Sequence, residues 1–167
     1  MIKLAFVLGL VLAGSSVALR QTPAGCSAPE YGQFAFWVGE WRVTSGGQEA
    51  GTNSVTLEEN RCLIHEHWKG AAGGTGQSFN WYDRSDSKWH QVWVASNGSA
   101  LLLTGTYQDG KLEYTGERPA PTGAGIVHHR LTFFKNADGT VRQLWETSPD
   151  RTSWTIVFDG LYTRQRS

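Results

Sequence analysis

The segment His65-Glu66-His67 has the spacing in this chain that best suits metal binding. Side chains two residues apart in a strand point to the same side, so both imidazoles can reach one ion. His90 and the pair His128-His129 are the other candidate donors, but the sequence fixes no third ligand beside them. Histidines that serve the surface or the core explain the pattern better, so we predict no metal site and no cofactor.

Glu66 is also a candidate for acid–base chemistry, because a carboxyl group beside a histidine in a desolvated pocket can transfer protons. The chain has no Gly-x-Ser-x-Gly nucleophile motif and no His-Glu-x-x-His zinc motif. We therefore favour a binding function and keep a hydrolase or an isomerase as the alternative.

These residues lie in a chain of short segments that read as β-strands. The chain has 167 residues with 8 Trp and 20 Gly, which suits strands and tight turns within one domain. Asn97-Gly98, Asp109-Gly110 and Asp138-Gly139 are typical of hairpin turns. A short helix is expected to begin at Pro29. The expected strands are 38–44, 51–58, 62–69, 77–82, 88–95, 100–108, 111–117, 126–135, 140–147 and 153–164. This pattern predicts an all-β fold, a single antiparallel up-and-down barrel of about ten strands.

Alternation along these segments places aromatic and polar side chains together on one face. Phe158 and Tyr162 belong to that face by the same alternation. The ligand-binding candidates on it are Glu66, Trp68, Ser78, Asn80, Tyr82, Gln91, Trp93, Arg130, Gln143 and Trp145. Aromatic walls with a few polar groups are typical of small-molecule pockets, so we expect this face to line the barrel and to bind a small amphipathic or aromatic molecule. We also expect Glu66 and Arg130 to form a buried pair or to hold a charged group. A barrel interior filled by its own side chains is the alternative.

The N-terminus reads as an export signal, with Lys3, the apolar run 4–12 and a cleavage site after Ala18. The predicted organisation is a signal peptide at 1–18, a lead segment at 19–29 and the barrel domain at 30–167. The apolar run is too short for a stable membrane span. We therefore predict a periplasmic or secreted protein, in which Cys26 and Cys62 form a disulfide. Two free thiols are the alternative.

The charge balance limits the partners. The formal net charge is +0, whereas nucleic-acid binders usually carry a basic stripe, so we expect no nucleic-acid partner. A structural or partner-binding module remains a further alternative, and exposed Trp patches would signal it. The sequence leaves a homodimer open.

Gly39-Glu40-Trp41 resembles the Gly-x-Trp signature that opens the calycin barrels, the group of lipocalins and fatty-acid-binding proteins. In that group the Trp lies across the base of the barrel and a basic residue of the last strand packs on it, which implies these parts for Trp41 and Arg164. The chain from about Cys26 onward also resembles a family of uncharacterised exported bacterial proteins with a calycin-like barrel. The segments that carry this second resemblance are 34–41, 66–68, 78–83, 89–94, 142–146 and 158–162.

Nitrobindins are similar calycin-like barrels that hold haem through a histidine. The two C-terminal strands expected here contain no histidine. A haem ligand would have to come from His65, His67, His90, His128 or His129, and we predict no haem.

Overall fold

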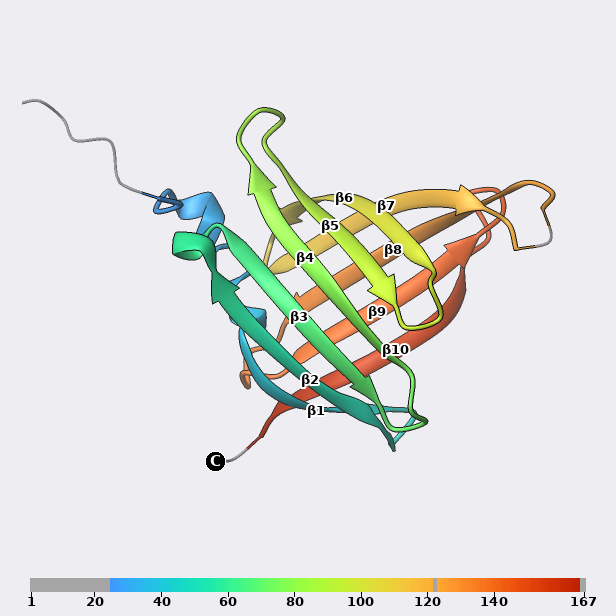
Figure 1. Ribbon diagram of the computed structural model, residues 1–167, viewed down its shortest axis with the longest axis horizontal. Helices are drawn as coiled ribbons and strands as arrows, with labels where there is room; N and C mark the ends of the chain where they lie inside the picture. Colours follow the sequence, from blue (N-terminus) through green and yellow to red (C-terminus); the bar gives the residue numbers. More distant parts are fainter. Residues whose placement is uncertain (1–24, 122, 166–167) are drawn as a thin grey trace, which may run out of the picture.

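Ten antiparallel strands form the molecule, which we describe from a computed structural model covering residues 25–121 and 123–165. The strands are β1 (Gly39–Ser45), β2 (Gln48–Glu58), β3 (Leu63–Gly70), β4 (Thr75–Asp83), β5 (Lys88–Ala95), β6 (Ala100–Gln108), β7 (Lys111–Pro119), β8 (Ile126–Lys135), β9 (Val141–Ser148) and β10 (Thr155–Arg164). Each strand pairs with the next, and β1 also pairs with β10, which closes the barrel (Figure 1). The predicted all-β up-and-down barrel is confirmed, and the bounds of β5, β6 and β8 match those expected from the sequence.

Hairpin turns set this topology. Asp109 and Gly110 both have positive φ, 51° and 79°, as a two-residue turn between twisted strands requires. Closure joins Trp41 to partners on both sides, with Asn53 opposite it on β2 and Arg164 opposite it on β10. A closed sheet leaves no unpaired edge of backbone donors and acceptors.

The segment before β1 fills one end of the barrel. Two short 3-10 helices, η1 (Pro29–Gly32) and η2 (Ala35–Trp37), stand where one short helix is expected from the sequence (Figure 1). Phe34 and Trp37 are fully buried, and their rings stack with centroids 4.9 Å apart. Both rings also contact Phe133 of β8. The plugged end of the barrel therefore holds an aromatic core.

A disulfide between Cys26 and Cys62 ties the lead segment to the barrel, as predicted. Cys62 follows η3 (Glu59–Arg61), the connection between β2 and β3. Predictions for residues 1–24, including the signal peptide, fall outside the described residues. Among the residues that are described, no helix has the length and apolarity needed to cross a membrane.

Candidate ligand-binding cavity

Strand register brings most of the predicted site residues to the inside of the barrel. Glu66 of β3 lies opposite Ser78 of β4, and Ser78 lies opposite Trp93 of β5. Asn80 pairs in the same way with Gln91. Ser78, Asn80 and Gln91 are buried although they are polar, which is expected of residues on the inner face of a closed barrel.

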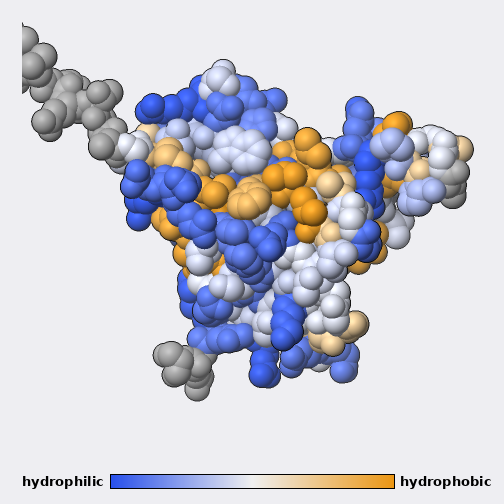
Figure 2. Space-filling view, viewed as in Figure 1, coloured by the Kyte–Doolittle hydropathy of each residue, from blue (hydrophilic) through white to orange (hydrophobic). Residues whose placement is uncertain are grey.

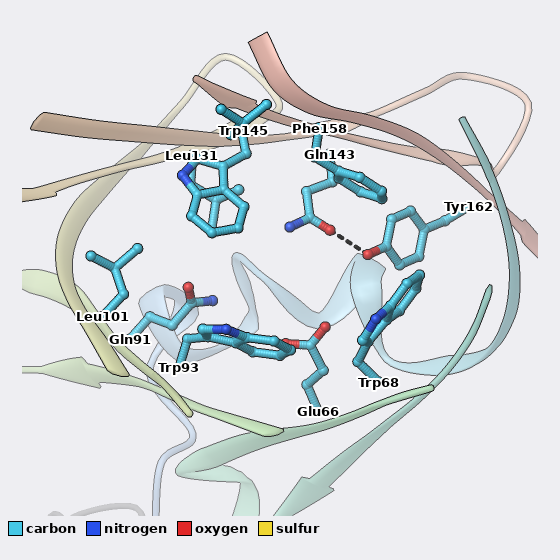
Figure 3. Close-up of a pocket in the computed structure, with 11 residues that line it drawn as sticks. Glu66, Trp68, Gln91, Trp93, Leu101, Leu131, Gln143, Trp145, Phe158 and Tyr162 are labelled. Carbon is cyan, nitrogen blue, oxygen red and sulfur yellow. Dashed lines mark hydrogen bonds between the residues drawn. The ribbon is translucent and has the colours of Figure 1, made fainter. Parts of the chain in front are cut away.

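The interior contains a cavity of about 230 Å³. It lies toward the end of the barrel opposite the aromatic plug, and Figure 3 shows its lining side chains directed toward one another. The lining residues are Glu66, Trp68, Gln91, Trp93, Leu101, Leu131, Gln143, Trp145, Val157, Phe158 and Tyr162. Six of the predicted ligand-binding residues are in this lining: Glu66, Trp68, Gln91, Trp93, Gln143 and Trp145.

The other predicted residues take different positions. Ser78 and Asn80 also point into the barrel but do not border the cavity, and they hydrogen-bond Glu66 and Gln91, which do. Tyr82 lies nearer the plug, where its ring packs edge-on against Tyr31 with centroids 5.5 Å apart. Tyr82 therefore belongs to the packing of the closed end.

Sequence reasoning did not assign Leu101, Leu131 or Val157 to the site. Leu101 follows the same alternation as the wall, but an apolar residue carries no signal that separates a cavity from a core. Leu131 was missed because the prediction placed Arg130, its neighbour, on the inner face of β8. Val157 is not predictable from alternation, because the β9–β10 register shifts between Ile156 and Phe158. Phe158 and Tyr162 are on the expected face, and both line the cavity.

Glycines make room for the aromatic walls. A Cβ at Gly76 would lie 2.3 Å from the ring of Trp93, and one at Gly160 would lie 2.5 Å from the ring of Phe158. Any other residue at these positions would displace a ring that borders the cavity. Trp68 and Phe158 meet edge to face with centroids 6.1 Å apart, so the walls also support one another.

A chain of buried hydrogen bonds runs along the wall and ends at Glu66. Gln91 Nε2 donates to Asn80 Oδ1 (2.7 Å), and Asn80 Nδ2 donates to the Ser78 hydroxyl (2.9 Å). Ser78 then donates to Glu66 Oε2 (2.5 Å), while Asn53 Nδ2 donates to Glu66 Oε1 (2.8 Å). The donors converge on the carboxylate, which is the arrangement that stabilises its ionised form.

Burial acts in the opposite direction. Desolvation raises the pKa of Glu66 to about 7, and the hydrogen bonds from Ser78 and Asn53 offset part of that rise. The Tyr162 hydroxyl donates to Gln143 Oε1, and burial raises the pKa of Tyr162 well above its ordinary value. No Lys or Arg side chain lines the cavity within the described parts of the chain.

The predicted pairing of Glu66 with Arg130 is wrong. His129, Leu131 and Phe133 are the buried alternating residues of β8, so Arg130 points outward. Its Nε donates to Glu146 Oε2 at 2.9 Å, and its guanidinium lies 4.2 Å from the centroid of the Trp154 ring. The alternation assigned to β8 from the sequence was displaced by one residue, which moves every side chain to the opposite face.

The histidines do not assemble beside Glu66. His65 and His67 are on the outer face, where His65 Nε2 lies 2.9 Å from Gln77 Oε1. His129 is buried, and its Nδ1 accepts a hydrogen bond from Trp145 Nε1. Burial lowers the pKa of His129 to about 4, so its imidazole is neutral at pH 7. The acid–base pair of Glu66 with a histidine, on which the enzyme alternative depends, is therefore not formed by the residues that line the cavity.

In residues 25–121 and 123–165, the potential metal ligands converge only at Asp83, Asp86 and His90. This group lies at the β4–β5 turn on the surface, and His90 Nε2 is already 3.0 Å from Asp86 Oδ2. It is separate from the cavity.

The base of the barrel shows the contact that the calycin resemblance implies for Trp41 and Arg164. The Arg164 guanidinium lies 4.4 Å from the centroid of the buried Trp41 ring. A Cβ at Gly39, which has φ of +144°, would lie 2.3 Å from Arg164 Nη1. Gly39 therefore makes the close approach of Arg164 possible.

The outer face carries an apolar patch over β4, β5 and β6 (Figure 2). Phe79, Val94 and Leu102 are its most exposed large side chains. All 8 Trp residues are buried or half-buried, so the exposed Trp patch that would signal a partner-binding module is not present.

Comparisons with protein-family models and with curated proteins find no significant match to this chain. The barrel establishes the fold, and the relation to a particular family stays a prediction from the sequence motifs.

Proposed function

We propose that this protein binds a small amphipathic molecule inside the barrel. The observation that supports the proposal is the cavity, in which aromatic rings and a few polar groups surround one open volume (Figure 3). Such a combination is typical of small-molecule sites. The volume is just below the ~300–1,000 Å³ of pockets for drug-sized ligands, which favours a smaller ligand.

Two amides offer hydrogen bonds to that ligand. Gln91 uses its nitrogen for Asn80, which leaves its carbonyl oxygen as an acceptor. Gln143 uses its oxygen for Tyr162, which leaves its amide nitrogen as a donor. Figure 3 shows both amides directed into the cavity. A ligand with an apolar body and a polar group would contact the aromatic rings with the first and the two amides with the second.

The test compares two substitutions on neighbouring residues. Leu101 is buried and borders the cavity, whereas Leu102 points outward and is 70% exposed. Leu101→Trp fills the cavity, and Leu102→Trp adds the same ring on the outside. Binding is measured by nuclear magnetic resonance titration with a panel of neutral, anionic and cationic amphiphiles.

We expect wild type and Leu102→Trp to bind the same members of the panel, and Leu101→Trp to lose at least about tenfold in affinity, equivalent to ~1.4 kcal/mol. Folding of both variants is checked by circular dichroism. Binding that survives in a folded Leu101→Trp variant, or no binding of any probe to wild type, would contradict the proposal.

A further inference from the structure

Glu66 is the one carboxyl group in the described lining of the cavity, and it has no cationic partner there. Its hydrogen-bond donors, Asn53 and Ser78, are neutral. A carboxylate can accept about four hydrogen bonds, so its two oxygens retain capacity for a ligand. Figure 3 shows one oxygen directed toward the open volume, between the indoles of Trp68 and Trp93.

We propose that the cavity selects organic monocations, with an ammonium group held against the Glu66 carboxylate and the faces of the surrounding tryptophans. This inference rests on the proposed function and names the chemical class of its ligand. A buried charge without a partner is unfavourable, and a bound cation compensates it. Aromatic faces attract cations through the ring quadrupole, most strongly at Trp.

The donor set argues against a metal ion in the cavity. Divalent metals take three or more ligands from protein side chains or water, with histidine, cysteine and carboxylate groups predominating. The described lining supplies one carboxylate, two amides and a tyrosine hydroxyl, among apolar side chains. The same unpaired negative charge disfavours an anionic ligand.

Among the described residues inside the barrel, Glu66 is the group whose pKa lies near neutral, because burial lowers the pKa of His129 to about 4. The titratable groups that face it are Tyr162 from β10 and Tyr114 from β7, and burial raises the pKa of each well above its ordinary value. Asn53 from β2, and Ser78 and Asn80 from β4, do not titrate. His65 adjoins Glu66 in sequence but lies on the outer face. Cation binding should therefore strengthen with rising pH as Glu66 ionises.

The experiment uses choline and its uncharged isostere 3,3-dimethylbutan-1-ol, which match in shape and differ in charge. The disulfide-bonded protein is titrated with each by calorimetry at about pH 5 and about pH 8.5, on either side of the Glu66 transition. We expect choline to bind at least about tenfold more tightly than the isostere at the higher pH, and to lose most of that preference at the lower pH, where Glu66 is protonated.

Glu66→Gln is the informative variant, because it removes the charge and keeps the shape. Asn53 Oδ1 is buried without a partner, so an inverted Asn53 amide can accept a hydrogen bond from the new Gln nitrogen. We expect this variant to lose most of the preference for choline, and the small preference that the tryptophan faces retain should be the same at both pH values. Glu113→Gln, which removes an outer-face carboxylate beside Lys111, should behave as wild type.

The outcomes separate this inference from the proposed function. If the isostere binds as tightly as choline at the higher pH, or if the full choline preference and its rise with pH survive in Glu66→Gln, the cation inference fails and the binding function stands. If neither compound binds and the wider amphiphile panel also fails, both are overturned. The two-ligand, two-pH comparison on wild type tests the inference even if Glu66→Gln does not fold.

Discussion

Hydrogen bonding and burial act in opposite directions on the pKa of Glu66. Asn53 and Ser78 donate hydrogen bonds to its carboxylate, while burial raises its pKa to about 7. A carboxyl group whose pKa is raised on folding binds more protons in the folded state than in the unfolded state. Its contribution to stability is therefore fully present at low pH and is lost as the pH rises through the folded-state pKa.

Because the contribution of Glu66 to stability falls as the pH rises, Glu66→Gln should change the free energy of unfolding in a pH-dependent way. Between the ordinary value of 4.5 and about 7, ionisation of Glu66 lowers the free energy of unfolding of wild type. Glutamine does not ionise, so at about pH 8.5 the variant should be more stable than wild type by up to ~3 kcal/mol. At about pH 4.5 the two should differ much less, because Glu66 is then protonated in the folded state. Urea denaturation at both pH values measures this, and an equal difference at the two pH values would show that Glu66 does not titrate in this range.

At the scale of the elements, the predicted alternation of inner and outer side chains is correct on β3, β4 and β5, has the wrong phase on β8, and is interrupted by a register shift on β10. On β3, β4 and β5 the predicted inner residues are those that the structure places inside. On β8 the inner set is displaced by one residue from the prediction, and Arg130 therefore joins Glu146 and Trp154 on the outside. On β10 the register shift before Phe158 allows Val157 and Phe158 both to border the cavity.

The connection between β2 and β3 carries a prediction of its own. Glu59, Asn60 and Arg61 all have positive φ, a conformation that is unfavourable for residues other than glycine. The disulfide anchors the lead segment beside this turn, and the two cysteines are 36 positions apart in the sequence. Replacing both cysteines by serine should lower the free energy of unfolding by about 3–4 kcal/mol, because the unfolded chain regains loop entropy.

Urea denaturation under non-reducing conditions tests this estimate. Wild type treated with a reductant should match the double variant, whereas the reductant should leave the double variant unchanged. An unaltered urea midpoint after loss of the bond would mean that the disulfide does not stabilise the barrel.

At the scale of the whole molecule, closure of the ten-stranded sheet encloses an interior, which separate strands do not have. Pairing of β1 with β10 completes the wall, and Phe34 and Trp37 fill one end of it. The remaining volume is bordered by side chains from strands far apart in sequence, from Glu66 on β3 to Tyr162 on β10.

Export is a prediction about the whole chain. The disulfide is of the kind that forms in oxidising compartments outside the cytosol, which supports a periplasmic or secreted location. Expression of the full chain in a bacterium should yield a mature protein whose first residue is Leu19, since cleavage is expected after Ala18. N-terminal sequencing of the periplasmic and cytosolic fractions checks this. Intact Met1 on folded protein in the cytosol would contradict it.

The sequence by itself determined the elements and much of the inner face of this protein. Turn residues mark the strand ends, and the period of two sorts side chains on regular strands. The pairing of the two cysteines was predicted because the chain has only two of them. The contact between Trp41 and Arg164 was implied by the resemblance to calycin barrels.

Only the tertiary structure decided that a cavity remains, which apolar residues border it, and that Glu66 has no basic partner. A leucine in a core and a leucine beside a void follow the same pattern in sequence. The difference depends on how closed strands fill the space between them, as with Gly76 beside Trp93. The direction of Arg130 likewise depends on the register of β8 between its neighbours, which interstrand hydrogen bonds fix.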